Sequence, residues 1–160
     1  MHSLVEELSL LLTDKNLRLV AAESCTGGMI AAAITDRSGS SAIFERGYVT
    51  YSNESKIEEL GVKSETIESF GAVSEQTAAE MAAGALKNSH ADIAVSVTGI
   101  AGPTGSTTHK PVGLVYIAIA LQNKPVQVFK NNFDGDRTSI RQATMEKALE
   151  LLIEKLSSVS

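Results

Sequence analysis

Ser24 and Cys25 are the side chains best placed for nucleophilic chemistry in this sequence of 160 residues. The apolar run of residues 17–22 predicts a buried strand before them, and the alanine-rich run of residues 29–34 predicts a helix after them. A turn between a strand and a helix directs main-chain N–H groups and the positive end of the helix dipole toward one point. The alternative is a purely structural turn, in which Ser24 or Thr26 caps the helix.

Lys56 is the residue that could activate the Ser24 hydroxyl. A serine hydroxyl is a weak nucleophile and needs a neighbouring base. The histidines lie at the terminus, between two predicted elements or in a loop: His2, His90 and His109. A lysine becomes a base when its amine is neutral, and both burial and a helix N-terminus lower its pKa. Lys56 falls in the first turn of the helix that we predict after Asn53. The alternative for Lys56 is a solvated side chain that pairs with Glu54 or Glu59.

Two tyrosines come shortly before Lys56, in the strand that we predict over residues 44–51. Tyr48 and Tyr51 each carry a phenol that could relay a proton or donate a hydrogen bond to an oxyanion. Tyrosines in a strand also serve as core or edge packing, because the ring is largely apolar. The pattern leaves both roles open for both residues.

A second glycine-rich segment follows the strand predicted over residues 92–98. Gly99, Gly102 and Gly105 recur at every third position, which indicates main chain that approaches another group closely. The segment lacks the Gly-Lys-Ser/Thr ending of a P-loop and the G-x-G-x-x-G spacing of a dinucleotide fingerprint. It predicts either one wall of a ligand pocket or a mobile surface loop.

Arg137 and Arg141 are four residues apart and therefore share one face of the last predicted helix. Both fall in its first turns, where the helix dipole disfavours a cation. A bound phosphate would offset that cost, and a guanidinium binds phosphate through paired hydrogen bonds. The alternative is pairing with nearby carboxylates, namely Asp134, Asp136 or Glu45.

The elements that must position these residues alternate between helices and strands. We predict helices over residues 3–15, from the Ser24 turn to residue 36, and over residues 55–60, 75–87 and 136–156, with a short turn over residues 64–71. The expected N-caps are Asn53, Ser74 and Asp136. We predict strands over residues 17–22, 44–51, 92–98, 114–121 and 125–133, the last two as a hairpin.

This order predicts an α/β protein, a three-layer α/β/α sandwich with a mixed, mainly parallel sheet, formed by a single domain over residues 1–160. In such sheets, ligands bind at the carboxyl ends of the strands. Because the Ser24 turn and the glycine-rich segment each follow a predicted strand, we expect them to lie close together.

Composition and charge argue against several functional classes. The net charge is −5, from 14 Lys and Arg against 19 Asp and Glu, so we expect no nucleic-acid groove. The longest apolar run, residues 114–121, is too short to span a membrane, and the acidic N-terminus does not resemble a signal peptide. The metal patterns H-x-H, C-x-x-C and H-E-x-x-H are absent, and the one cysteine allows no internal disulfide. We expect a cytoplasmic protein without metal or cofactor.

Six segments taken together resemble the CinA C-terminal domain family, the nicotinamide-nucleotide amidases. They are residues 22–28 (AESCTGG), 44–56 (FERGYVTYSNESK), 71–74 (GAVS), 98–103 (TGIAGP), 110–113 (KPVG) and 135–137 (GDR). The resemblance covers nearly the whole chain and, at this length, is to the stand-alone form of the family. One departure is residues 102–106, which read Gly-Pro-Thr-Gly-Ser where the family commonly has Gly-Pro-x-Gly-Gly.

The resemblance implies hydrolysis of nicotinamide mononucleotide to nicotinate mononucleotide and ammonia, in pyridine-nucleotide salvage. It implies Ser24 as nucleophile and Lys56 as catalytic lysine, assisted by a tyrosine, for which we prefer Tyr51 over Tyr48. Cys25 is the alternative nucleophile. The other expected contacts are with the oxyanion or substrate, by Cys25, Thr26, Gly27, Gly28, Tyr48, Thr98, Gly99 and Gly102, and with the phosphate, by Arg137 and Arg141.

The alternative function is a non-catalytic nucleotide-binding or interaction module linked to competence or the DNA damage response. Such a module would keep the glycine segments and the arginines, but it would not need Lys56 against Ser24. We expect the protein to bind a small-molecule substrate and to bind neither nucleic acid nor a membrane. We also expect a homo-oligomer, because the alanine-rich helix over residues 75–87 could pack closely on a second copy. The preference among nicotinamide nucleotides and other amides stays open.

Overall fold

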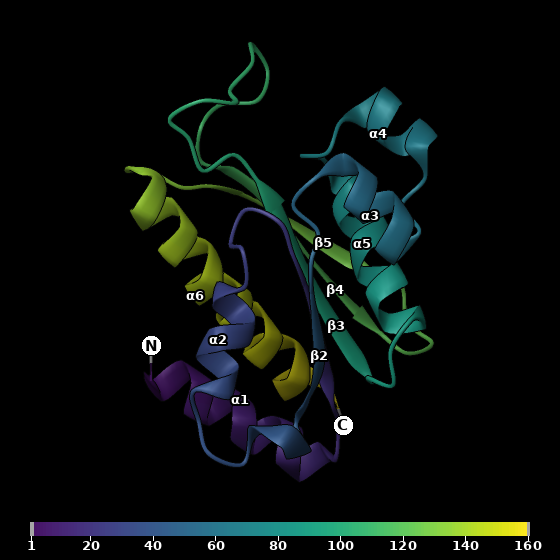
Figure 1. Cartoon of the computed structure of the whole chain (residues 1–160). Helices are drawn as coiled ribbons and strands as arrows, with labels where there is room; N and C mark the ends of the chain where they lie inside the picture. Colours follow the sequence, from purple (N-terminus) through teal and green to yellow (C-terminus); the bar gives the residue numbers. More distant parts are fainter. Residues whose placement is uncertain (1, 160) are drawn as a thin grey trace.

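One five-stranded sheet runs through residues 2–159, the part of the chain that the computed structural model describes (Figure 1). β1 (Leu19–Glu23) lies between β2 (Phe44–Val49) and β3 (Ile93–Gly99), and both pairs are parallel. β4 (Leu114–Leu121) runs antiparallel between β3 and β5 (Gln127–Asn132), so the strand order is β2-β1-β3-β4-β5. The sheet is mixed, as predicted, and only β4 runs against the common direction.

Helices cover both faces of this sheet, which confirms the three-layer α/β/α sandwich (Figure 1). One face carries α1 (His2–Lys15), α2 (Met29–Thr35) and α6 (Arg137–Ser158). The other carries α5 (Glu75–Lys87), with α3 (Asn53–Leu60) and α4 (Ser64–Phe70) packed beside it. No helix within residues 2–159 has the length and apolar character needed to cross a membrane.

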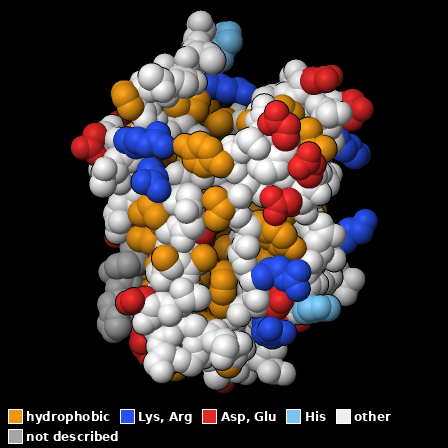
Figure 2. Space-filling model, in the orientation of Figure 1, with side chains coloured by type: hydrophobic (Ala, Val, Ile, Leu, Met, Phe, Trp, Pro, Cys, Tyr) orange, Lys and Arg blue, Asp and Glu red, His pale blue; other side chains and the backbone are white. Residues whose placement is uncertain are grey.

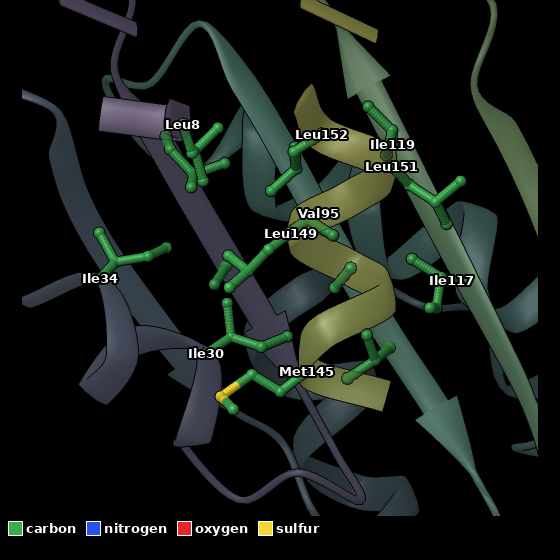
Figure 3. Packing of buried hydrophobic residues seen from close by; sticks show 14 of the residues in the cluster. Leu8, Ile30, Ile34, Val95, Ile117, Ile119, Met145, Leu149, Leu151 and Leu152 are labelled. Atoms are coloured by element: carbon green, nitrogen blue, oxygen red, sulfur yellow. The ribbon is translucent and has the colours of Figure 1, made fainter. Parts of the chain in front are cut away.

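The larger apolar core lies between the sheet and the layer of α1, α2 and α6. Figure 3 shows side chains from these elements pointing toward one another: Leu8 from α1, Ile30 and Ile34 from α2, Val95 from β3 and Leu149 from α6. Each of them is at most 1% exposed. Full burial of such a side chain stabilises the fold by about 1.5–3 kcal/mol. The core therefore fixes α2 and α6, the helices next to the Ser24 turn, against the sheet.

Several predicted boundaries are confirmed. α5 begins directly after Ser74, whose side chain accepts a hydrogen bond from the Thr77 N–H, and it ends at Lys87 as predicted. β4 spans the predicted residues 114–121 and pairs antiparallel with β5, as the hairpin requires. α6 is capped by Asp136, whose side chain accepts a hydrogen bond from the Ser139 N–H. In each case a strong cap or an uninterrupted apolar run marks the boundary.

Other boundaries differ from the prediction. The N-cap of α3 is Ser52, whose side chain accepts a hydrogen bond from the Ser55 N–H, so Asn53 is the first helical residue rather than the cap. β1 starts two residues later than predicted and includes Glu23. Residues 40–42, predicted as loop, form a short 3-10 helix.

α2 begins at Met29, several residues after Ser24. The reason is the conformation of the two preceding glycines, Gly27 with φ +58° and Gly28 with φ +107°. Left-handed backbone cannot continue into a right-handed helix, and glycine adopts it at little cost. A distinct turn over residues 24–28 therefore separates β1 from α2.

The alanine-rich helix α5 packs within the chain. Ala78, Ala82 and Ala85 are fully buried in the cluster between α5 and the sheet. A Cβ added at Gly84 would lie 1.7 Å from the carbonyl oxygen of Leu60, at the end of α3. The small residues of α5 therefore serve contacts inside one copy. A homo-oligomer stays a prediction, but α5 no longer supplies the reason for it.

The carboxyl ends of the three parallel strands meet at one edge of the sheet. The Ser24 N–H donates to the Val97 carbonyl oxygen of β3 at 3.1 Å, and the Thr50 N–H donates to the Glu23 carbonyl oxygen at 2.9 Å. β5 points the same way, so α6 begins at this edge as well. The expected proximity of the Ser24 turn and the glycine-rich segment is confirmed.

Candidate active site

A cavity of about 300 Å³ opens at this edge of the sheet. Its wall comes from the Ser24 turn, residues 51–56, residues 72–73, residues 98–105 and the start of α6. The charged side chains in the wall are Lys56 and Arg137, and no Asp or Glu of the described chain is among the lining residues. Such a wall suits a small neutral or anionic ligand.

The surrounding surface is divided by charge. Figure 2 shows Lys and Arg side chains over the N-terminal end of α6 and Asp and Glu side chains over α3 and α4. A larger hollow of about 480 Å³ lies between α1, α2 and α6. The described part of its lining is mostly apolar and holds no Ser, Cys or Lys, so it offers no nucleophile beside a base.

Lys56 and Ser24 are in direct contact within the cavity. Lys56 Nζ lies 3.0 Å from Ser24 Oγ, and it also donates to the carbonyl oxygens of Thr50 at 2.8 Å and Tyr51 at 3.2 Å. Lys56 is only 1% exposed, and this burial lowers the pKa of its amine from 10.5 to about 8. Within residues 2–159 no carboxylate forms an ion pair with Lys56. The alternative of a solvated lysine paired with a glutamate is therefore wrong.

These contacts determine where the lone pair of a neutral Lys56 points. A neutral amine has two N–H bonds and one lone pair. When the Thr50 and Tyr51 carbonyl oxygens accept the two N–H bonds, the lone pair faces Ser24 Oγ, which then donates its proton. With a pKa of about 8, roughly one lysine in ten is neutral at pH 7. The arrangement is that of a general base beside its nucleophile.

Cys25 lines the same cavity in a different environment. It is 6% exposed, and burial raises the pKa of its thiol to about 11. Such a thiol holds almost no thiolate at neutral pH, although the thiolate is the reactive form. Lys56 Nζ hydrogen-bonds to Ser24. The contacts thus favour Ser24 over Cys25 as nucleophile.

Glu23, the last residue of β1, was not predicted as a site residue. Its buried carboxylate lies at the N-terminus of α2. It is 1% exposed, and its oxygens accept four hydrogen bonds. The donors are the Thr26 hydroxyl at 2.5 Å and the N–H groups of Gly28 at 3.2 Å, Ile30 at 3.0 Å and Ala31 at 3.0 Å. The alternative in which Ser24 or Thr26 caps α2 is therefore wrong, because Glu23 binds these N–H groups.

The predicted oxyanion site is partly occupied by this arrangement. The Gly28 N–H bonds the Glu23 carboxylate, and the Gly27 N–H donates to the Ser24 carbonyl oxygen at 3.0 Å. In this structure both N–H groups therefore already have acceptors, and neither is free to donate to an oxyanion. The turn holds two other residues predicted to bind the oxyanion, Cys25 and Thr26. Cys25 lines the cavity and Thr26 does not. The Cys25 N–H is therefore the best candidate.

Arg137 lies in the cavity wall, as the phosphate prediction requires. Its Nη1 donates to the Gly102 carbonyl oxygen and its Nη2 to the Tyr51 hydroxyl, both at 2.9 Å. Within residues 2–159 neither Arg137 nor Arg141 forms an ion pair with a carboxylate, so the alternative of such pairing is wrong. Arg137 keeps further N–H groups for a ligand, because a guanidinium carries five.

Arg141 has different surroundings, although it is one turn away on the same helix. It is not among the lining residues of the cavity. Its Nε donates to the Cys25 carbonyl oxygen at 3.0 Å and its Nη2 to the Thr26 carbonyl oxygen at 3.2 Å. The structure therefore does not bring Arg141 to the predicted phosphate site, because its guanidinium faces the main chain of the Ser24 turn.

The two tyrosines point to different regions. The Tyr48 hydroxyl donates to the Asn88 carbonyl oxygen at 3.0 Å, and its ring packs against the cluster under α5. The structure does not bring Tyr48 to the cavity, because strand alternation turns its side chain toward α5. Tyr51 follows the end of β2 and lines the cavity, with its hydroxyl accepting a hydrogen bond from Arg137.

Thr98, Gly99 and Gly102 line the cavity, as predicted. The Thr98 hydroxyl donates to the Ala72 carbonyl oxygen at 2.8 Å, which ties the segment to residues 72–73. A Cβ at Gly99 would lie 2.5 Å from the Val115 side chain, so glycine is required there by the neighbouring strand rather than by a ligand. Seven residue pairs fix β3 against β4, the two strands that the segment connects.

The lining residues that were not predicted as site residues include Asn53, Val73 and Thr104. Asn53 and Ser52 both favour the cap position, and only the observed bond to Ser52 leaves the Asn53 amide at the cavity. Val73 and Thr104 carry no chemical signature. The available signal is their place within or directly after segments that carry the family resemblance.

Known proteins resemble this chain in sequence. The family model of the CinA C-terminal domain matches residues 1–156. A CinA-like protein from Endomicrobium trichonymphae is 58% identical over 146 residues, which cover 91% of this chain and 34% of that protein. A relative from Caldicellulosiruptor saccharolyticus is 53% identical over 151 residues, which cover 94% of this chain and 36% of the relative. The chain thus spans about a third of the length of these curated relatives.

Solved structures match over nearly the whole chain. The competence/damage inducible protein CihA from Agrobacterium tumefaciens matches with a TM-score of 0.94 and 49% identity, over 98% of this chain and 95% of that chain. The competence damage-inducible protein A (ComA) from Klebsiella pneumoniae subsp. pneumoniae MGH 78578 matches with a TM-score of 0.96 and 36% identity, over 99% and 98%. The α/β fold is the same in all three.

Proposed function

Because the chain belongs to the CinA C-terminal domain family, we propose that it is an amidohydrolase that converts nicotinamide mononucleotide to nicotinate mononucleotide and ammonia. One observation carries the proposal: a buried Lys56 amine, with no carboxylate partner among the described residues, lies 3.0 Å from Ser24 Oγ in a cavity. This geometry supports acyl transfer through a serine ester. The choice of a nicotinamide nucleotide as substrate rests on the sequence resemblance.

In the acylation step, neutral Lys56 accepts the Ser24 hydroxyl proton while Oγ attacks the carboxamide carbon. The pyridinium ring withdraws electrons and makes that carbon a better electrophile. The C=O electron pair moves to oxygen, and the Cys25 N–H is the candidate donor for the oxyanion; such a donor is typically worth about 3 kcal/mol. Lys56 then gives its proton to the carboxamide nitrogen, the C–N bond breaks and ammonia leaves.

In the deacylation step, water hydrolyses the nicotinoyl ester on Ser24. Lys56, neutral again after the first step, takes a proton from the attacking water. The ester C–O bond breaks, Ser24 Oγ regains a proton from Lys56, and the nicotinate carboxyl group is released. One residue thus acts as base and acid in both halves of the reaction.

Arg137 is the residue that we propose for the 5′-phosphate. Two of its donors bind the Gly102 carbonyl and the Tyr51 hydroxyl, which hold the guanidinium in the cavity wall. The remaining N–H groups suit the oxygens of a phosphate. With no carboxylate among the described lining residues, the cavity favours an anionic substrate over a cationic one.

The experiment is to incubate the protein with nicotinamide mononucleotide at pH 8 and to measure ammonia. Ser24→Ala should lower the rate by about 10³-fold or more, because the ester can no longer form. Cys25→Ala is the matched comparison and should keep measurable turnover. An inactive Cys25→Ala beside an active Ser24→Ala would reverse the nucleophile assignment. Absence of ammonia release from the wild type across the pH range would contradict the amidase.

The second candidate, a non-catalytic nucleotide-binding or interaction module, accounts less well for Lys56. Burial of an amine without a carboxylate partner costs free energy, which shows in its lowered pKa. A binding module gains nothing from this cost, whereas a general base needs it. The ammonia assay separates the two functions directly.

A further inference from the structure

The Ser24 turn makes few hydrogen bonds of its own. Within it, the Gly27 N–H donates to the Ser24 carbonyl oxygen, and the Met29 N–H donates to the Thr26 carbonyl oxygen at 3.1 Å. The two glycines that shape the turn are also the residues with the greatest conformational freedom in an unfolded chain. The position of Ser24 Oγ relative to Lys56 must therefore depend on groups outside the turn.

Glu23 supplies the contacts to the donors of the turn and of the first turn of α2. Its carboxylate accepts hydrogen bonds from the Thr26 hydroxyl and from three N–H groups within residues 28–31. Hydrogen bonds to an ionised carboxylate are about twice as strong as neutral ones. Since Glu23 is 1% exposed, water cannot replace this carboxylate without a rearrangement of the turn.

Arg141 supplies the contacts to the acceptors of the same turn. Its guanidinium donates to the Cys25 and Thr26 carbonyl oxygens from α6, more than 100 residues away in the sequence. A Cβ added at Gly27 would lie 3.3 Å from Arg141 Nη2, so the guanidinium packs directly on the glycine backbone. Glu23 and Arg141 therefore hold main-chain groups of opposite polarity in one short segment.

We propose that Glu23 and Arg141 form a clamp that positions Ser24 for attack. Neither residue lines the cavity, so both act through the turn rather than on the substrate. The inference rests on the proposed function in one respect, that Ser24 is the nucleophile. Displacement of a reacting group by about 1 Å can cost 10²-fold in rate, so loss of either contact should appear mainly in kcat.

Two variants test the clamp. Glu23→Gln keeps the side-chain shape but replaces one acceptor oxygen by an NH2 donor, and Arg141→Met keeps an unbranched, shorter side chain but removes every donor. Each should lower kcat for ammonia release by about 10- to 100-fold and leave KM within about threefold. Amide hydrogen exchange of residues 24–31 should become faster in both. Arg141→Lys, which cannot bridge two carbonyls as a fork, should lie between Arg141→Met and the wild type.

Matched controls separate positioning from general loss of stability. Glu80→Gln alters a carboxylate that similarly accepts bonds from the Lys63 N–H and the Thr66 hydroxyl, at the start of α4. Arg37→Met removes an arginine that pairs with Glu6, away from the turn. Both controls should leave kcat within about twofold and the exchange of residues 24–31 unchanged, whatever the change in their melting temperatures.

The outcomes distinguish the clamp from the proposed function. Unchanged exchange of residues 24–31 in both Glu23→Gln and Arg141→Met would overturn the clamp. So would a raised KM with normal kcat in Arg141→Met, because that result would return Arg141 to the phosphate. A wild type that releases no ammonia contradicts the amidase alone, and the exchange measurement then still decides the clamp. If Glu23→Gln does not fold, Thr26→Val removes one donor to Glu23, and Thr26→Ser should restore it.

Discussion

The Ser24 turn and the segment over residues 100–113 both border the cavity, but they are held in different ways. In the turn, Ser24, Cys25 and Thr26 are at most 8% exposed, and two charged side chains bind the main chain. In the segment, residues 103–109 are exposed. Its middle is tied to the rest of the chain by Arg137, at the Gly102 carbonyl, and by Lys110, which donates to the Phe70 carbonyl.

The Ser24 turn and residues 100–113 therefore suit different roles in the site. A segment with few buried contacts opens locally at low cost, whereas a buried and charge-bound turn opens only with its surroundings. The chemistry needs a fixed distance between Ser24 Oγ and Lys56 Nζ, whereas substrate entry needs a boundary that can move. We therefore expect changes in the turn to affect kcat and changes in the segment to affect KM.

The largest expected effect is at Lys56, whose amine contacts Ser24 in the buried turn. Lys56→Met keeps an unbranched side chain of similar bulk but removes the base, and it should lower kcat for ammonia release by about 10³-fold or more. Lys124→Met, in the exposed turn between β4 and β5, is the control and should leave kcat unchanged. More than about a tenth of wild-type activity in Lys56→Met would contradict the role of Lys56 as the base.

The next effect is the pH dependence of the same amine. Because only neutral Lys56 accepts a proton and its pKa is about 8, kcat/KM should rise about 50-fold between pH 6 and pH 8 and then level off. The rate should be measured with constant ionic strength. A profile that is flat between these values would assign the proton transfer to another group.

Stability provides a check on this pKa that does not need a substrate. The folded state releases the Lys56 proton near pH 8 and the unfolded state near pH 10.5, so the unfolded state binds more protons between these values. The free energy of unfolding of the wild type, relative to Lys56→Met, should therefore rise with pH over this interval, by about 3 kcal/mol. A difference that falls or stays constant would contradict the lowered pKa.

A smaller effect is expected at the substrate side. Arg137→Gln should raise KM for nicotinamide mononucleotide about tenfold and leave kcat within about threefold, because it removes an anion contact that is uniform through the reaction. Steady-state kinetics of ammonia release measure both constants. A fall in kcat with unchanged KM would contradict this expectation, because Arg137 would then contribute to the reaction step rather than to substrate binding.

The smallest expected effect is at Gly105, in contrast to the effect at Gly27 of the Ser24 turn. Gly27 has φ +58° and Gly105 has φ +96°, so alanine is strained at both positions. Gly27→Ala also presses on Arg141 and should lower kcat about tenfold, whereas Gly105→Ala should change KM by about twofold. Kinetics and melting temperatures of the two variants test this contrast, and equal effects on kcat would contradict it.

Features that depend on local side-chain patterns could be predicted from the sequence. The bounds of α5 follow from the Ser74 cap and an apolar stripe, and β4 follows from one uninterrupted apolar run. The pairing of Ser24 with Lys56 could be predicted because the serine needs a base and each histidine is poorly placed. The sheet order then brought these residues together.

The clamp could not be predicted, because most of its partners are main-chain groups. Arg141 and the Cys25 carbonyl are 116 residues apart, and a carbonyl has no signature in the sequence. The pattern of two arginines four residues apart instead suggested one shared ligand. The role of Glu23 could not be predicted for a related reason. Its carboxylate binds N–H groups of the turn and of the next helix, and their positions are known only from the structure.

The connection between β3 and β4 has a consequence for how this fold can diversify. The two strands are antiparallel neighbours held in register by seven residue pairs. The pairing of the strands therefore does not depend on the length or sequence of the connection. Insertions, deletions or whole exchanged loops between residues 103 and 110 should leave Ser24 and Lys56 undisturbed. Evolution or a protein engineer could therefore change the ligands that fit the cavity by changing this connection, without rebuilding the Ser24–Lys56 pair.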